Sequence, residues 1–269
     1  QHLYFTGFFK IKFNDKNAYM YSLGTILENK IFWKGLENAH EPLSIQIWYF
    51  LSKKSKYIFD VGANVGLYPL ISFMANSKSE IHAFEPSNRF LIALYKIKKK
   101  NKINLKINSS ALGDIESTIY YDGYRTSSDI KEVKYYAEKI NSKWEKIKQI
   151  KLSKYIDTKK INRIDLIKMD IEKYEFRVLK DIKNYIKQFR PNMLIEIING
   201  DEESKNNINN TIGEIIHKLK YKIYLIDDKN KVISYSSSIE YSTYWNVLFL
   251  NSNTSKLFEK KFNVIKFVK

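Results

Sequence analysis

The amino-acid sequence predicts an α/β fold, in which a single Rossmann-like domain is built on a mostly parallel sheet of seven strands. Three short apolar runs end at acidic residues, and a helical pattern follows each of them; they span residues 57–61, 80–84 and 164–169. Near-continuous apolar runs of this length are typical of strands that are covered on both faces. Their alternation with helices indicates a parallel sheet with helices on both sides.

Helices are expected before and after the first of these strands, and after the second. Residues 41–51 carry apolar side chains on one helical face. Residues 67–74 are apolar on nearly every side, and Pro69 falls in the first turn, where its missing N–H costs nothing. After Pro86, apolar residues recur at helical spacing, and Ser87 is available as the N-cap.

The second half of the chain is less regular. Strands are expected at residues 193–197, 222–226 and 245–250, and a helix is expected at 208–219. An insertion beside the site is expected at 115–148. It would hold a hairpin strand at 118–121, a polar loop at 124–128 and a charged helix at 131–140. The predicted domain plan is an N-terminal extension packed on the core (1–40), the main domain (41–250) and a C-terminal tail (251–269).

The composition is that of a soluble globular protein. Of the 269 residues, 44% are hydrophobic, and no apolar run approaches the roughly 18 to 20 residues of a membrane-spanning helix. Residues 8–13 alternate as a strand would and form no apolar signal-peptide core, so a cytoplasmic location is expected. The absence of cysteine excludes disulfides, thiolate zinc sites and a cysteine nucleophile.

The net charge of +17 would suit nucleic acid, an anionic membrane or a phosphorylated small molecule. However, the lysines are dispersed among abundant isoleucine and asparagine, as in a chain of biased composition. The densest cluster, at residues 96–102, follows an apolar helical stripe, where the helix dipole favours cations. We therefore expect a solvated helix face that needs no ligand.

A glycine turn follows the first strand. Asp60-Val61-Gly62-Ala63-Asn64-Val65-Gly66 leads into a helix, and Glu85 ends the next strand 19 residues after Gly66. The glycines allow a tight turn, and an acidic residue at this distance can accept both ribose hydroxyls, so an adenosine site is predicted. A dinucleotide enzyme needs a second glycine where Asn64 stands, so that the backbone approaches a pyrophosphate. S-adenosylmethionine has no phosphate, and Asn64 could bind its aminoacyl part.

Five stretches of the chain resemble the FkbM-type methyltransferases, a family of Rossmann-fold O-methyltransferases. They are residues 59–68, 82–86, 111–114, 165–172 and 194–197, and they keep the family's order over about residues 41–250. The resemblance implies the class I methyltransferase fold, with S-adenosylmethionine as the cofactor. By this resemblance, the cofactor-binding residues are Asp60, Gly62, Ala63, Asn64, Gly66, Glu85, Pro86, Ser110 and Ala111.

The family pattern after the fourth strand is Asp-x-Glu-Gly-x-Glu, and this chain reads Asp170-Ile171-Glu172-Lys173-Tyr174-Glu175. Lys173 therefore stands where the family has glycine. If that glycine permits a left-handed backbone or a close approach of the substrate, the geometry of the acceptor corner is altered here.

The acceptor side needs groups that align the reaction. Methyl transfer from a sulfonium is an in-line displacement, so oxygen, methyl carbon and sulfur must be aligned and water excluded. Asp170 lies at the carboxyl end of the fourth strand, where open α/β sheets bind ligands, and we expect it to contact the acceptor hydroxyl. Glu172 and Glu196 are the next nearest carboxylates by topology, and the three are the predicted catalytic residues.

The route of the hydroxyl proton stays open. A carboxylate of pKa near 4 cannot fully deprotonate an alcohol of pKa about 15.7, because the gap of about 12 units corresponds to roughly 16 kcal/mol. Either the proton leaves late, as the methyl bond forms, or a divalent cation lowers the pKa of the hydroxyl. Asp170 and Glu196 would be the ligands of such an ion, Mg²⁺ or Mn²⁺.

Several other polar residues are expected to have structural roles. His82 lies inside an apolar strand and is interpreted as a satisfied core histidine. Glu175 falls in the first turn of a helix, where the dipole alone favours it. His40 and His217 show no metal-ligand spacing.

The resemblance points to carbohydrate acceptors, so the main hypothesis is an O-methyltransferase acting on a sugar hydroxyl of a nucleotide-activated sugar or surface glycan precursor. RNA is an alternative acceptor, although the sequence shows neither a coherent basic face nor an appended binding module. Lys173 prompts a second alternative, a non-catalytic cofactor-binding partner subunit. A homo-oligomer is compatible with each hypothesis.

Overall fold

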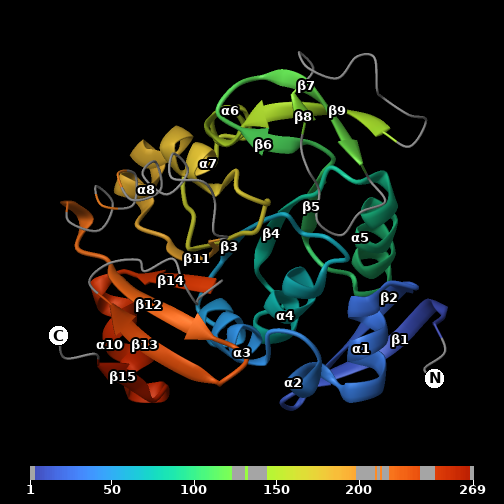
Figure 1. Ribbon diagram of the computed structural model, residues 1–269, viewed down its shortest axis with the longest axis horizontal. Helices are drawn as coiled ribbons and strands as arrows, with labels where there is room; N and C mark the ends of the chain where they lie inside the picture. Colours follow the sequence, from blue (N-terminus) through green and yellow to red (C-terminus); the bar gives the residue numbers. More distant parts are fainter. Residues whose placement is uncertain are drawn as a thin grey trace.

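The computed structural model describes residues 4–122, 131–132, 144–197, 210, 213, 218–236 and 246–266. In this part of the chain, nine strands form a central mixed sheet in the order β15-β13-β12-β14-β11-β10-β3-β4-β5 (Figure 1). Five neighbouring strands run parallel. They are β5 (Leu105–Asn108), β4 (Glu80–Phe84), β3 (Tyr57–Val61), β10 (Leu166–Met169) and β11 (Asn192–Glu196).

The remaining strands give the sheet its mixed character. β14 (Asn246–Leu250) runs antiparallel to both of its neighbours, β11 and β12 (Lys222–Asp227). β13 (Val232–Ser236) is antiparallel to β12, and β15 (Val264–Lys266) pairs parallel with β13. The predicted α/β class is confirmed. The predicted number of seven strands was wrong for the described part of the chain, because β13 and β15 extend the sheet.

The segment after residue 250, expected as a tail, forms α10 (Ser252–Lys261) and then β15. Phe258 of α10 is fully buried, with its ring centroid 4.9 Å from that of Tyr224 and 4.8 Å from that of Phe262. These ring contacts hold α10 on the sheet, so that the chain returns beside β13. A strand of three residues is too short to show a periodic signal in the sequence.

Each central strand is buried on both faces, because alternate side chains enter two separate cores. In β3, Ile58 packs into one core and Phe59 into the other. Helices α3 (Pro42–Ser52), α4 (Leu67–Ala75) and α5 (Asn88–Asn101) cover the first core. Helices α6 (Leu152–Thr158), α7 (Glu175–Asp181) and α8 (Lys183–Phe189) cover the second. The helices predicted at residues 41–51, 67–74 and after Pro86 are thus confirmed.

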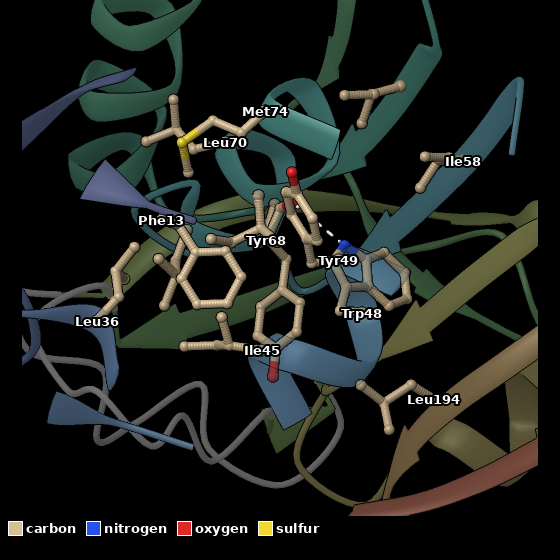
Figure 2. Packing of buried hydrophobic residues seen from close by; sticks show 14 of the residues in the cluster. Phe13, Leu36, Ile45, Trp48, Tyr49, Ile58, Tyr68, Leu70, Met74 and Leu194 are labelled. Carbon is tan, nitrogen blue, oxygen red and sulfur yellow. Dashed lines mark hydrogen bonds between the residues drawn. The ribbon is translucent and has the colours of Figure 1, made fainter. Parts of the chain in front are cut away.

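The N-terminal residues form a hairpin of β1 (Thr6–Phe13) and β2 (Lys16–Leu23), followed by α1 (Ile26–Lys34) and α2 (Leu36–Ala39). The inner side of the hairpin joins the first core. Figure 2 shows Phe13 beside Tyr49 of α3, with ring centroids 5.2 Å apart. Nearby, the indole N–H of Trp48 donates to the backbone oxygen of Tyr68 at 3.2 Å, which ties α3 to α4.

A second, smaller sheet lies at the top of the view in Figure 1. Its order is β6-β9-β7-β8, with bounds β6 (Ala111–Gly113), β7 (Ser117–Asp122), β8 (Lys131–Glu132) and β9 (Trp144–Lys151). The strand predicted at 118–121 is confirmed as β7. The prediction of a charged helix at 131–140 was wrong for its first two residues, which form β8 and pair with β7.

The rest of that helix and the polar loop at 124–128 lie outside the described residues, as does most of the helix predicted at 208–219. In the part of the chain that the structure describes, no helix is both long and apolar enough to span a bilayer.

Candidate active site

The turn between β3 and α4 depends on two glycines with positive φ. Gly62 has φ 87°, and a Cβ there would lie 1.9 Å from the carbonyl oxygen of Asp170. Gly66 has φ 86°, and a Cβ there would lie 2.3 Å from Cδ1 of Ile97 on α5. Gly62 therefore lets the turn lie against the end of β10, and Gly66 lets α4 pack on α5.

Glu85, at the end of β4, holds this turn in place. Its two carboxylate oxygens accept the backbone N–H of Asn64 at 2.7 Å and that of Ser87 at 2.8 Å. Burial raises the pKa of Glu85 to about 7, although the two N–H donors favour the ionised form. A carboxylate has about four lone-pair sites, so Glu85 keeps capacity for further donors. Asn64 has φ 48°, a left-handed conformation that asparagine tolerates.

A cavity of about 390 Å³ opens beside this turn. Among the residues predicted from the sequence, its lining includes Gly62, Asn64, Glu85, Pro86, Ser110, Ala111, Asp170, Glu172 and Glu196. Asp60, Ala63 and Gly66 do not line it. Ala63 is buried and donates its N–H to the carbonyl of Phe84 at 3.0 Å, so it shapes the turn from behind. The structure thus brings the predicted cofactor and acceptor residues to one cavity.

Asp60 lies under the turn and is almost fully buried. Both of its carboxylate oxygens lack a hydrogen-bond partner among the described residues. Burial raises the pKa of Asp60 to about 7, even though the Lys168 ammonium opposes the shift. An unpaired buried carboxylate is costly, and the charge of the nearby Lys168 ammonium offsets part of that cost.

Lys168 was not among the residues predicted for the site, but it is a buried cation beside Asp170. Its Nζ lies 2.9 Å from Oδ2 of Asp170 and 4.5 Å from the centroid of the Tyr68 ring. Burial lowers the pKa of Lys168, but the carboxylates of Asp170, Glu41 and Asp60 outweigh it and leave that pKa raised. Lys168 pairs in register with Asp60 across β10 and β3. It is therefore charged, and it neutralises part of an acidic cluster.

Glu196 and Asp170 interact beside this lysine. Burial and the charge of Asp170 hold the pKa of Glu196 well above its ordinary range, which favours a protonated Glu196 that donates a hydrogen bond to Asp170. Burial would raise the pKa of Asp170, but Lys168 and this hydrogen bond leave it lowered. Asp170 is thus ionised, and 33% of its side chain is exposed toward the cavity.

A further carboxylate, Glu41, comes from the segment before α3. The Tyr68 hydroxyl donates to Oε2 of Glu41 at 2.7 Å, and Nε2 of His40 lies 3.6 Å from Oε1 of Glu41. Both His40 and Glu41 line the cavity, as do Thr25, which precedes α1, and Ile26, Leu27 and Lys30 of α1. No sequence pattern singled out these residues, because only the packing of the N-terminal segment brings them to the site.

Comparison with known proteins shows the family of this chain. Residues 60–243 match the family described as the methyltransferase FkbM domain. The chain belongs to this family. The match begins at Asp60 and includes the cofactor turn, Lys168, Asp170 and Glu196, and it confirms the resemblance seen in the sequence. No curated protein matches the chain.

Similar solved structures have low identity to this FkbM domain. Methyltransferase FkbM from Methylobacillus flagellatus KT is 16% identical with a TM-score of 0.47, over 72% of this chain and 43% of that chain. An O-methyltransferase from Bacillus cereus in complex with SAH is 10% identical with a TM-score of 0.45, over 76% and 79%. The SAH-bound Podospora anserina methyltransferase is 12% identical with a TM-score of 0.44, over 77% of each chain. The chain spans less than half the length of the Methylobacillus protein.

The corner after β10 in this FkbM domain has the backbone that a glycine would favour. Glu172 has φ 55° and Lys173 has φ 79°. Lys173 thus adopts a left-handed conformation, which costs a residue with a Cβ about 1–2 kcal/mol. The position tolerates lysine, and Glu172 still lines the cavity. The corner therefore keeps its backbone conformation although lysine replaces the family glycine, and Lys173 is strained there.

The structural roles expected for Glu175 and His82 are confirmed. Glu175 is buried and accepts the backbone N–H of Ile171 at 2.7 Å, at the start of α7. Burial raises its pKa to about 7. In the second core, Nδ1 of His82 lies 2.8 Å from the Tyr155 hydroxyl and Nε2 lies 2.9 Å from Oε1 of Glu80. His217 lies outside the described residues.

A divalent cation between Asp170 and Glu196 does not fit these residues. Asp170 is already paired with the Lys168 ammonium at 2.9 Å, and this buried positive charge would repel a cation. Within the described ranges, no group of three or more His, Asp or Glu side chains is placed to hold a metal. The possible Mg²⁺ or Mn²⁺ site is therefore not supported, because the Lys168 ammonium already compensates the negative charge of Asp170.

Proposed function

We propose that this domain transfers a methyl group from S-adenosylmethionine to a hydroxyl of a carbohydrate, in the form of a nucleotide-activated sugar or a surface glycan precursor. The observation that carries the proposal is a single cavity lined by the glycine turn, Glu85 and Asp170. Its volume of about 390 Å³ falls in the range of small-molecule sites.

The cofactor residues suit the parts of S-adenosylmethionine. Glu85 would accept the ribose hydroxyls with the lone pairs that its two backbone donors leave. Ser110 and Ala111 would border the adenine, and Asn64 the aminoacyl part. The unpaired oxygens of Asp60 favour a site in which an ammonium group, or water bound to it, lies close to the turn. The bound cofactor supplies an electrophilic methyl group on sulfur.

Asp170 would orient the acceptor hydroxyl. Because Lys168 and the proton of Glu196 both stabilise its ionised form, Asp170 is a good hydrogen-bond acceptor and a weak base. The hydroxyl proton then passes to the Asp170 carboxylate only as the carbon–oxygen bond forms, late in the displacement. Glu172 and Glu41 line the same cavity and could accept bonds from other hydroxyls of a sugar.

A screen of sugar nucleotides with labelled methyl donor, with and without a chelator, tests the proposal. We expect methyl transfer to at least one sugar nucleotide, at a rate that the chelator does not change. Transfer to RNA but to no sugar would overturn the carbohydrate assignment. Tight cofactor binding without single-turnover transfer to any acceptor would favour a non-catalytic partner subunit.

A further inference from the structure

One surface of the molecule carries many cations and few carboxylates; Asp15, in the turn of the N-terminal hairpin, lies 3.6 Å from the Lys16 ammonium. Strands β1 and β2 and helix α5 together contain eight Lys or Arg residues and no Asp or Glu. They adjoin, because the Asn101 side chain of α5 donates to the Tyr19 carbonyl at 2.7 Å and accepts from the Tyr19 N–H at 2.7 Å. We define the outer side of this hairpin and the exposed side of α5 as the basic face (right of Figure 1).

The lysines of α5 extend over the hairpin. Lys96 Nζ lies 5.6 Å from the centroid of the Tyr21 ring, and Lys100 Nζ lies 4.7 Å from that of Tyr19 and 5.6 Å from that of Phe8. The helix dipole accounts for cations in the last turn of α5. It does not account for the rings that they cover, nor for Lys10 and Lys12 on the outer side of β1. The lysines that look dispersed in the sequence are therefore gathered by the fold.

Apolar side chains lie exposed on the same face. Ile92 and Tyr95 of α5 are 50% and 56% exposed, and they share the exposed side of the helix with Lys96 and Lys99. Single exposed apolar residues are ordinary on protein surfaces. A helix that combines an exposed isoleucine, a tyrosine and flanking lysines is typical of elements that lie in the headgroup region of a bilayer.

We propose that the basic face docks on an anionic lipid surface, with Ile92 and Tyr95 entering the headgroup region and the lysines facing lipid phosphates. Single-stranded nucleic acid would instead need a groove with free aromatic faces on which bases stack. Here the Lys100 ammonium lies over the rings of Phe8 and Tyr19, which are 42% and 41% exposed, and the 50% exposed Ile92 offers no ring on which a base could stack. Phe90, on the buried side of α5, lines the active-site cavity, so the helix that carries the basic face also borders the site.

Sedimentation of the full chain with vesicles tests this inference. We expect binding to vesicles of phosphatidylcholine with one third phosphatidylglycerol, no binding to phosphatidylcholine alone, and release when NaCl is raised from about 0.1 M to about 0.5 M. The triple variant Lys96→Gln, Lys99→Gln, Lys100→Gln should lower the partition coefficient about 100-fold, since each lysine near such a surface contributes about fivefold. Ile92→Ser should lower it further by about fivefold.

Helix α10 offers matched controls, since it also ends in lysines and lies on the opposite side of the molecule in Figure 1. Lys256→Gln, Lys260→Gln, Lys261→Gln removes the same charge, and Leu257→Ser removes a side chain that is 46% exposed. Both should leave vesicle binding within about twofold of the wild type, and thermal melts would verify that all variants fold. Equal losses in the two triple variants, or no binding to anionic vesicles at all, would overturn the proposal. So would tighter binding to an RNA oligonucleotide that Ile92→Ser leaves unchanged.

Discussion

Replacing Lys168 by methionine tests whether this lysine holds the acidic cluster together. The Nζ to Oδ2 distance of 2.9 Å to Asp170 corresponds to an attraction of about 6 kcal/mol at an effective dielectric constant of about 20. Much of that attraction offsets the cost of burying the lysine. Removing one partner of a buried pair costs about 3–5 kcal/mol. Because 33% of the Asp170 side chain is exposed and so partly solvated, we expect a loss of about 2–4 kcal/mol.

The sign of the pH dependence follows from the pKa of Asp170, which Lys168 helps to keep low in the folded state. A carboxyl with a lowered folded pKa stabilises the protein above its unfolded pKa, and that stabilisation is lost as pH falls through the folded pKa. In Lys168→Met, the pKa of Asp170 rises. The gap in unfolding free energy between wild type and variant should therefore be largest near neutral pH and shrink toward pH 5.

Urea unfolding near neutral pH and at pH 5 measures the change in unfolding free energy. Two further variants test whether this change is specific to the pair of Lys168 and Asp170. Lys106→Met changes an exposed lysine in β5 of the same sheet and should shift the unfolding free energy by less than about 0.5 kcal/mol. The double variant Lys168→Met, Asp170→Asn removes the unpaired charge and should be more stable than Lys168→Met by at least about 1 kcal/mol. If Lys168→Met unfolds at the same urea concentration as Lys106→Met, or if the double variant shows no recovery, the reasoning about this cluster is wrong.

Three other variants and one titration follow from the site. Glu85→Ala should weaken the binding of S-adenosylhomocysteine, measured by calorimetry, at least tenfold, because charge-assisted hydrogen bonds to the ribose are lost. Tight binding of NAD by the wild type would refute the assignment of this cofactor site. Lys173→Gly should raise Tm by about 2 °C, since the left-handed strain exceeds the entropic cost of glycine by about 1 kcal/mol, whereas Lys173→Ala should not. Asp170→Asn should lower turnover by about 10² to 10⁴ with cofactor affinity nearly unchanged, and full turnover would remove Asp170 from the acceptor site. Because the pKa values of Asp60 and Glu85 are raised to about 7, S-adenosylhomocysteine affinity should fall as pH drops below 7, and a flat profile from pH 8 to 6 would contradict that assignment.

The central strands could be predicted from the sequence because each is covered on both faces. Side chains of β3 and β4 enter two cores, so the apolar runs at 57–61 and 80–84 are nearly continuous and their bounds agree with the structure. β13 and β15 lie at the far edge of the sheet, and their sequences mix polar with apolar residues over a few positions. β13 follows β12 as an antiparallel hairpin, whereas the place of β15 depends on the burial of Phe258, a contact between distant parts of the chain that no local pattern reveals.

The cofactor turn could be predicted because backbone geometry fixes its residue types. Gly62 and Gly66 have positive φ and no room for a Cβ, so the spacing itself carries the information. The sequence carries a usable signal for Lys168. A lysine within the apolar run Leu166 to Met169 is two residues from Asp170, and the period of two in a strand places both side chains on one face. A buried charge requires a partner. His40 and Glu41 had no such signal.

The acidic cluster suits orientation of the acceptor better than removal of its proton. Lys168 and the proton on Glu196 make Asp170 less basic than a free aspartate, which widens a gap in pKa that is already about 12 units for an alcohol. If Asp170 contacts the acceptor, a stronger base at this position would also be protonated more of the time and would hold the hydroxyl less firmly. The arrangement therefore lowers the basicity of Asp170, but it keeps the Asp170 carboxylate ionised and in a fixed orientation. In that case the rate must come from alignment of the reacting atoms and exclusion of water, which the N-terminal residues that line the cavity would provide.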